Sequence, residues 1–115
     1  MKVTERAVQI WPVLALAARN RQTLTYEIVE GLTGQFRAGL GQCLDPIQAY
    51  CVIHELPPLT ALVVEKGSGI PGTGFTAAAD VPHAQAQVFA FDWSAHKCPT
   101  AEAFRDAIAE TKSQA

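Results

Sequence analysis

Cysteine and histidine stand close together at two places in the chain, and both pairs carry side chains that zinc prefers. The pairs are Cys51-x-x-His54 and His96-x-Cys98. A structural zinc site usually combines a tight knuckle with a second, well-spaced pair, whereas a cysteine at an apolar helix position is more often a small buried hydrophobe. We therefore expect no metal centre, and we expect no other cofactor.

Nucleophilic catalysis would need a cysteine beside a histidine base. Each of Cys43, Cys51 and Cys98 is a formal candidate, but the sequence places none of them next to such a base. Asp92 and His96 lie one helical turn apart, which suits a general acid–base pair but is also a common chance spacing. We expect no catalytic residue, and we therefore do not expect an enzyme.

Three glycines spell the spacing of a dinucleotide-binding loop, since Gly67, Gly69 and Gly72 read G-x-G-x-x-G after an apolar segment. Such a loop must open a helix, and Pro71 together with Gly74 prevents a helix from starting there. We interpret the segment as a turn and not as a nucleotide site.

The composition predicts one folded domain over residues 1–115, with 49% hydrophobic and 17% charged residues. The net charge of -2 and the pI near 5.8 argue against a basic coat that binds nucleic acid without specificity. The longest apolar run, residues 11–18, is far shorter than the ~20 residues of a membrane span. Three cysteines form no disulfide framework, and no signal peptide is evident, so we expect a cytoplasmic protein.

Residues 24–75 follow the order of parts in a winged helix-turn-helix. Thr25 is a good N-cap for a helix over 26–32 whose inner face holds Ile28, Val29 and Leu32, and Gly34 suits a left-handed C-cap. A second helix is predicted over 35–44, followed by a strand over 62–64. Residues 70–75 are expected to form either the return of a hairpin or an ordered loop.

The flanking segments are predicted to be helical. A first helix begins at Thr4 as cap and either kinks at Pro12 or restarts there. Asp45-Pro46 signals the start of another helix, because it combines a cap with proline at the first position. We divide the chain into a core over 1–75 and a helical C-terminal extension over 76–115.

The C-terminal extension holds one ambiguous segment. Residues 81–93 suit a strand that stacks Phe89, Phe91 and Trp93, or a helix capped by Asp80, and the alanine and glutamine content favours the helix. The aromatic residues of this segment would serve as a stacking platform for single-stranded nucleic acid, as core, or as a dimer contact. Thr100 caps a final amphipathic helix over 101–112.

Residues 24–75 resemble the DNA-binding half of the O6-alkylguanine-DNA alkyltransferase and alkyltransferase-like family. The matching landmarks are the start of the first helix at Thr25-Tyr26, its end at 32–34, the Arg37–Gly41 segment and the glycine-rich stretch after Val63-Val64. Active members of the family carry Pro-Cys-His-Arg immediately before that Val-Val pair. Here residues 56–62 read LPPLTAL, so the alkyl-accepting cysteine is absent and alkyl transfer is not expected.

The resemblance implies where DNA would be contacted. Arg37 matches an arginine that the family inserts into the base stack, and Tyr26 matches a tyrosine near the target phosphate. Gly39 and Gly41 would allow close approach to the sugar–phosphate backbone, although close helix packing would explain them equally well. The remaining candidate contacts are Gln35, Gln42 and Lys66.

These observations predict a mainly α (α+β) winged helix-turn-helix protein of the bacterial cytoplasm that binds duplex or damaged DNA without catalysing a reaction. The alternative is a protein–protein interaction module or homodimer, whose contact surface would be formed by residues 89–93 and 104–108.

Overall fold

The computed structural model describes residues 2–35 and 37–114, except for the side chains of Arg37 and Gln114. This part of the chain is compact and mainly helical, with 65% of residues in helices and a two-stranded parallel sheet. The mainly helical class predicted from the sequence is therefore confirmed. The elements are α1 (Val3–Arg19), β1 (Leu24–Thr25), α2 (Tyr26–Thr33), α3 (Arg37–Ile53), η1 (Leu59–Leu62), β2 (Val63–Val64), α4 (Val81–Ala90), η2 (Trp93–Ala95) and α5 (Ala101–Gln114).

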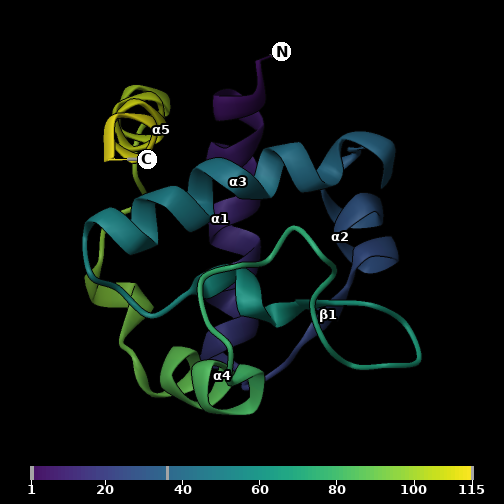
Figure 1. Ribbon diagram of the computed structural model, residues 1–115. Helices are drawn as coiled ribbons and strands as arrows, with labels where there is room; N and C mark the ends of the chain where they lie inside the picture. The colour runs from purple at the N-terminus through teal and green to yellow at the C-terminus, as the bar shows by residue number, and fades with distance from the viewer. Residues whose placement is uncertain (1, 36, 115) are drawn as a thin grey trace.

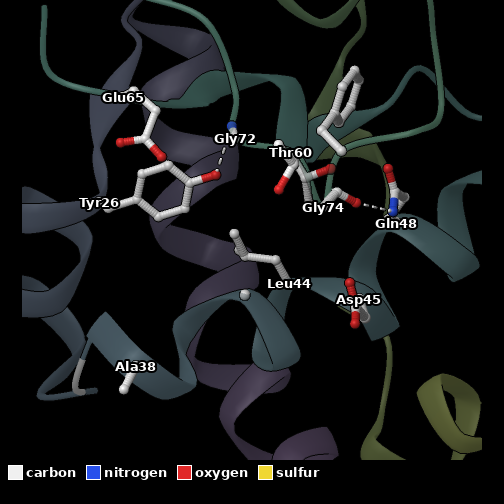
Figure 2. Close-up of a pocket in the computed structure, with 12 residues that line it drawn as sticks. Tyr26, Ala38, Leu44, Asp45, Gln48, Thr60, Glu65, Gly72 and Gly74 are labelled. Carbon is white, nitrogen blue, oxygen red and sulfur yellow. Dashed lines mark hydrogen bonds between the residues drawn. The ribbon is translucent and has the colours of Figure 1, made fainter.

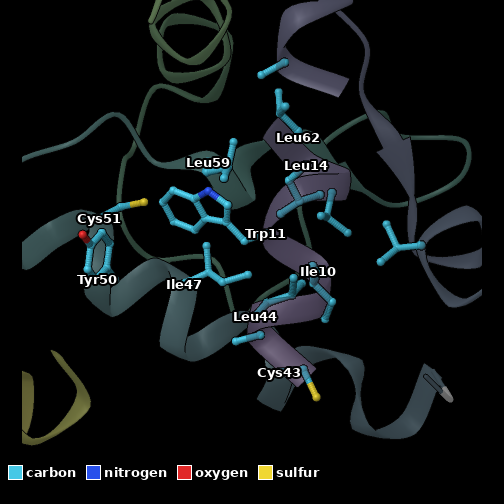
Figure 3. Close-up of a cluster of buried hydrophobic side chains, with 14 of the residues drawn as sticks. Ile10, Trp11, Leu14, Cys43, Leu44, Ile47, Tyr50, Cys51, Leu59 and Leu62 are labelled. Atoms are coloured by element: carbon cyan, nitrogen blue, oxygen red, sulfur yellow. The ribbon is translucent and has the colours of Figure 1, made fainter. Parts of the chain in front are cut away.

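The helices α1 and α3 cross at the centre of the molecule, with α2 at one end of α3 and α5 near the other (Figure 1). The hydrophobic core lies at this crossing (Figure 3). Its largest member is Trp11, which is 1% exposed and makes edge contacts with Tyr50 and Trp93, each at a ring-centroid distance of 5.6 Å. The same core includes Val88 and Phe104, so the segment after residue 76 completes it and is more than an appended extension.

The first helix continues through Pro12, so the alternative in which a helix restarts at Pro12 is wrong. It begins two residues earlier than expected: Lys2 is the N-cap, and the backbone N–H of Lys2 donates a hydrogen bond to Glu5 Oε1 at 3.1 Å. Thr4 is buried inside the helix, so its predicted capping role is wrong.

The second helix has the predicted caps but not the predicted inner face. Thr25 Oγ1 accepts a hydrogen bond from the Ile28 backbone N–H at 3.2 Å, and Gly34 adopts a left-handed φ of 75°. Only Val29 is buried in this helix, whereas Leu32 is 63% exposed and Ile28 is also exposed. Because α2 lies at the edge of the bundle, a single stripe of its surface meets α1 and α3.

The third helix runs unbroken from Arg37 to Ile53, so the prediction that a new helix begins at Asp45-Pro46 is wrong. Proline inside a helix costs about 3 kcal/mol. The buried residues on both sides of Pro46 recur at helical spacing on one continuous stripe, and burying each large apolar side chain contributes about 1.5–3 kcal/mol. The free energy gained by burying this stripe therefore outweighs the cost of Pro46 in the helix. The stripe consists of Leu40, Cys43, Leu44, Ile47, Tyr50 and Cys51.

The predicted hairpin is not present in the described part of the chain. The strand β2 instead pairs in parallel with β1, with Leu24 opposite Val63 and Thr25 opposite Val64. After β2 the chain forms a loop, in which the Glu65 N–H donates to the Ile70 carbonyl at 2.8 Å. Proline and several glycines in 67–74 prevent this segment from forming a regular strand that could hydrogen-bond to β2. One edge of β2 is instead hydrogen-bonded to β1.

The ambiguous segment after residue 80 is a helix, as favoured by its composition. Asp80 Oδ1 accepts a hydrogen bond from the His83 backbone N–H at 3.1 Å and caps α4. Thr100 Oγ1 likewise accepts from the Ala103 N–H at 3.1 Å, and α5 buries Phe104 and Ala107. Across the described residues, no helix is both long and apolar enough to cross a membrane.

Candidate functional site

The N-terminal half of α3 presents a small, nearly flat face. Ala38, Gly41, Gln42 and Asp45 recur at spacings of three and four, and all of them are exposed. The opposite stripe of the same helix is buried in the core, which fixes the rotation of the helix about its axis. A backbone covered only by small side chains can be approached closely by a partner.

The two glycines of this half-helix are not required by packing inside the protein. Among the described atoms outside the same stretch of helix, a Cβ atom on Gly41 would meet none within 4 Å, and one on Gly39 would meet the flexible end of the Gln35 side chain, with its Nε2 at 2.7 Å. Each glycine in a helix interior costs about 1 kcal/mol relative to alanine. Close helix–helix packing therefore does not account for them.

The other predicted contacts lie around this face. Arg37 is the first residue of α3, and its side chain lies outside the described part of the structure. Gln35 precedes α3, although the sequence predicted it as the first residue of that helix, and its half-buried side chain lies against Gly39. Lys66 is exposed in the loop after β2 and lines a shallow depression at the start of α2.

A cleft of about 260 Å³ opens between α3 and the loop that follows β2 (Figure 2). Tyr26 forms one wall, and its hydroxyl oxygen accepts a hydrogen bond from the Gly72 backbone N–H at 3.0 Å. Tyr26 was predicted as a DNA contact, and the contact observed is with the protein's own loop. The cleft brings Tyr26 together with Ala38 and Gly41 of the α3 face.

The far side of the loop is fastened by Gln48 from α3. Its Nε2 donates to the Gly74 carbonyl at 3.2 Å, and its Oε1 accepts from the backbone N–H groups of Thr76 at 2.9 Å and Ala77 at 3.1 Å. Tyr26 and Gln48 thus hold the same loop at two points. The cleft is shaped by these hydrogen bonds before any partner arrives.

Thr60 is a residue of this cleft that the sequence interpretation missed. It is 4% exposed, it lines the cleft, and its Oγ1 has no hydrogen-bond partner among the described residues. A buried hydroxyl without a partner costs about 1–3 kcal/mol. The available signal was a single polar residue within the apolar run 59–64.

The two cysteine and histidine pairs do not form one cluster of possible metal ligands in the described residues. Within the described part of the chain, no three side chains of the ligating types come together. The rings of Tyr50 and His54 stack at 4.1 Å, and the Tyr50 hydroxyl lies 3.1 Å from His96 Nε2. Asp92 instead accepts a hydrogen bond from the Ser94 hydroxyl at 2.6 Å, which lowers the pKa of its carboxyl, so the spacing of Asp92 and His96 reflects local structure.

The three thiols are expected to react slowly with alkylating reagents. Burial raises the pKa of the Cys51 thiol to about 12, and it also raises the pKa values of Cys43 and Cys98. The thiolate is the reactive form, and Cys98 is the only one of the three that is half-exposed. With iodoacetamide at pH 8, followed by peptide mass spectrometry, Cys98 should be modified first and Cys51 at least tenfold more slowly. Equal rates for Cys51 and Cys98 in the folded protein would contradict this assignment, and unfolding in urea should make all three rates similar.

The aromatic residues at the end of α4 do not form an exposed platform. Trp93 is 4% exposed, and its Nε1 donates to the Val88 carbonyl at 2.8 Å. Phe89 and Phe91 are half-buried against the core, and Phe104 is fully buried. Of the segments predicted as the contact surface of the alternative dimer, Trp93, Phe104 and Ala107 are interior, and the remaining residues are exposed or half-buried.

A comparison with known protein families found no matching family model, and searches of curated proteins and of solved structures found no match. The function is therefore argued from the geometry.

Proposed function

We propose that the protein binds DNA as a helix-turn-helix, with the N-terminal half of α3 against the duplex. The observation that carries the proposal is the exposed face of Ala38, Gly41 and Gln42, on a helix whose glycines are not needed for packing. Helix-turn-helix proteins place the N-terminal residues of their second helix against base edges in the major groove. Ala38 and Gly41 would let the helix backbone come close to the DNA, whereas Asp45 on the same face would have to lie away from the phosphates.

The basic residues near this face support the same orientation. Arg37 is the first residue of α3, and Lys66 is exposed beside the start of α2, so both elements that would face the duplex carry a basic residue. The loop that carries Lys66 takes the place of the wing, since β2 is paired with β1. Two point contacts of this kind are compatible with an overall charge of -2, because phosphate binding depends on local charge.

The proposed activity is recognition without chemistry. The segment that stands in place of the family's cysteine motif carries Thr60, and a threonine hydroxyl is a far weaker nucleophile than a thiolate unless a base activates it. By its resemblance to alkyltransferase-like proteins, the chain would recognise damaged or undamaged duplex DNA, with Arg37 entering the base stack.

Replacing Arg37 by alanine is expected to weaken duplex binding about tenfold. Loss of one phosphate or base-stack contact should also reduce the slope of log K against log salt by roughly one. Fluorescence anisotropy with a labelled duplex, between about 50 and 200 mM salt, measures both quantities. A second duplex of the same sequence with one O6-methylguanine tests the preference for damage.

The matched control is Arg105→Ala, because Arg105 is an exposed arginine on α5. This variant should bind as the parent protein does. Equal losses for the two variants would show that only net charge matters, and absence of binding at the lowest salt would refute the proposal.

A further inference from the structure

A groove of about 440 Å³ runs along the C-terminal half of α1, on the side where α1 meets α4 and η2 (Figure 1). Its other wall is the segment over 89–98. None of the described residues that line it belongs to α3 or to the loop after β2. Binding in this groove is therefore independent of the proposed DNA-binding face.

The walls of the groove are apolar over most of its length. From α1, it is lined by Pro12, Ala15 and Leu16, and Leu16 is 61% exposed. From the other wall, it is lined by the half-buried rings of Phe89 and Phe91. A ligand that covers this surface removes apolar area from water, which favours binding of an apolar chain or ring.

Polar atoms on the inner wall are paired within the protein. Trp93 Nε1 donates to the Val88 carbonyl at 2.8 Å, and His96 Nε2 lies 3.1 Å from the Tyr50 hydroxyl oxygen. A polar group placed against these rings would lose its hydrogen bonds to water and gain none from the paired atoms. The part of a ligand that meets this wall is therefore expected to be apolar.

Positive charge stands at one end of the groove. Arg19, in the last turn of α1, and Arg21, just beyond it, are both exposed and line the groove. The one carboxylate among the described lining residues is that of Asp92. A hydrogen bond from the Ser94 hydroxyl lowers the pKa of this carboxyl, and the charge of Arg19 also lowers it. Two guanidinium groups and one carboxylate leave a net charge of +1, which suits a monoanion.

Arg21 has two features that a role in binding would explain. Among the described residues, no hydrogen bond or ion pair holds its guanidinium group, so that group is available to a ligand. Its backbone adopts a left-handed φ of 55°, which residues other than glycine, asparagine and aspartate rarely adopt. Asn20, directly before it, has an ordinary φ of -85°. An arginine at position 21 thus carries a conformational cost that a glycine would avoid.

We infer that the groove binds a linear medium-chain fatty carboxylate, with its alkyl chain along Leu16 and the two phenylalanine rings and its carboxylate at Arg19 and Arg21. Guanidinium groups bind carboxylates through parallel N–H···O hydrogen bonds. The wall on α1 extends from Trp11 to Arg19, roughly 12 Å at about 1.5 Å per residue, and this length favours a chain over a compact ring. The volume of about 440 Å³ lies within the range of ~300–1,000 Å³ that is typical of small-molecule sites.

Titration with decanoate, followed by intrinsic tryptophan fluorescence, tests the inference. Both tryptophans of the chain, Trp11 and Trp93, line the groove, so a saturable change in fluorescence is expected. The titration stays below the concentration at which decanoate forms micelles, and calorimetry should give one site per chain. Decyltrimethylammonium has a similar chain and the opposite charge, and it should bind at least about tenfold more weakly. Equal binding of the two compounds would overturn the inference.

Two shorter acids test the shape of the ligand. Hexanoate has the same carboxylate with a shorter chain, and it should bind at least about tenfold more weakly than decanoate. An aromatic monocarboxylate, 2-naphthoate, cannot extend along the wall on α1, and it should bind at least about threefold more weakly than decanoate. Binding of either acid as tight as that of decanoate would refute a linear chain as the ligand.

Variants at the charged end connect binding to the two arginines. Arg19→Gln and Arg21→Gln each remove a charge and keep most of the side-chain length. Each should weaken decanoate binding at least about fivefold and leave the binding of uncharged 1-decanol unchanged. Arg105→Gln on α5 is the matched control, since Arg105 is exposed and lies outside the groove. Equal losses in all three variants would show that only net charge matters and would overturn the assignment.

A variant of the apolar wall tests the other half of the site. Leu16→Ala removes an exposed side chain, so the protein should fold, and it should weaken the binding of decanoate and of 1-decanol about threefold. Leu32→Ala is the control, because Leu32 is 63% exposed on α2 and lies outside the groove. Unchanged decanoate binding in Leu16→Ala and in Arg21→Gln would show that the ligand does not lie in this groove.

Discussion

Replacing Trp11 by alanine is expected to lower the free energy of unfolding by about 3–5 kcal/mol. Trp11 is fully buried where α1 crosses α3, and its ring also contacts Phe104 of α5 at a centroid distance of 6.1 Å. Alanine would leave a cavity bounded by three helices that cannot all close on it. Small domains are stable by about 5–15 kcal/mol, so the variant should be partly unfolded well below the melting temperature of the parent.

Urea denaturation followed by circular dichroism measures this loss. The matched control is Leu16→Ala on the same helix, because Leu16 is 61% exposed and its removal should change stability by no more than about 0.5 kcal/mol. A loss below about 1 kcal/mol for Trp11→Ala would mean that Trp11 is not the centre of the core. A separate unfolding transition that removes only part of the helical signal would mean that α5 folds separately from α1 and α3.

The sequence correctly predicted those helix ends that are fixed by a residue within one turn of the helix. Thr25, Asp80 and Thr100 each cap a helix as expected, because a side-chain oxygen near a free backbone N–H acts within one turn of the chain. Gly34 ends α2 in the left-handed conformation for a similarly local reason.

The errors arise where distant segments decide the outcome. Pro46 carries a strong local signal to begin a helix, but the burial of residues on both sides of it against α1 and α5 keeps α3 continuous. The strand at Val63 pairs with Leu24, which lies 39 positions earlier in the chain, and no turn signal marks such a parallel pairing.

The candidate site was predicted in part. The sequence and the family resemblance directed attention to Tyr26 and to the α3 face, and the structure brings these together at one cleft. Thr60 and Gln48 were missed, because their importance depends on burial and on contacts with a loop 26 to 29 residues away from Gln48. A lone polar residue in an apolar run is the one signal that the sequence offered for Thr60.

Replacing Gly41 by glutamate is expected to weaken duplex binding at least a hundredfold if the α3 face meets DNA. The substitution places a carboxylate where phosphates and base edges would approach, and like charges in contact cost several kcal/mol. A Cβ atom at this position would meet no described heavy atom within 4 Å outside its own stretch of helix, so we expect the variant to fold. Its stability should in fact rise by somewhat less than about 1 kcal/mol, since glutamate is a better helix former than glycine.

Two further substitutions at the same position separate charge, bulk and helix propensity. Gly41→Gln has the size of glutamate without its charge and should bind at least tenfold better than Gly41→Glu. Gly41→Ala should raise stability by about 1 kcal/mol and reduce binding least. Anisotropy with one duplex at low salt, together with urea denaturation of all three variants, measures both properties. If the three variants bind like the parent while their stabilities rise, α3 does not face DNA, and its glycines must serve another partner that approaches the same face.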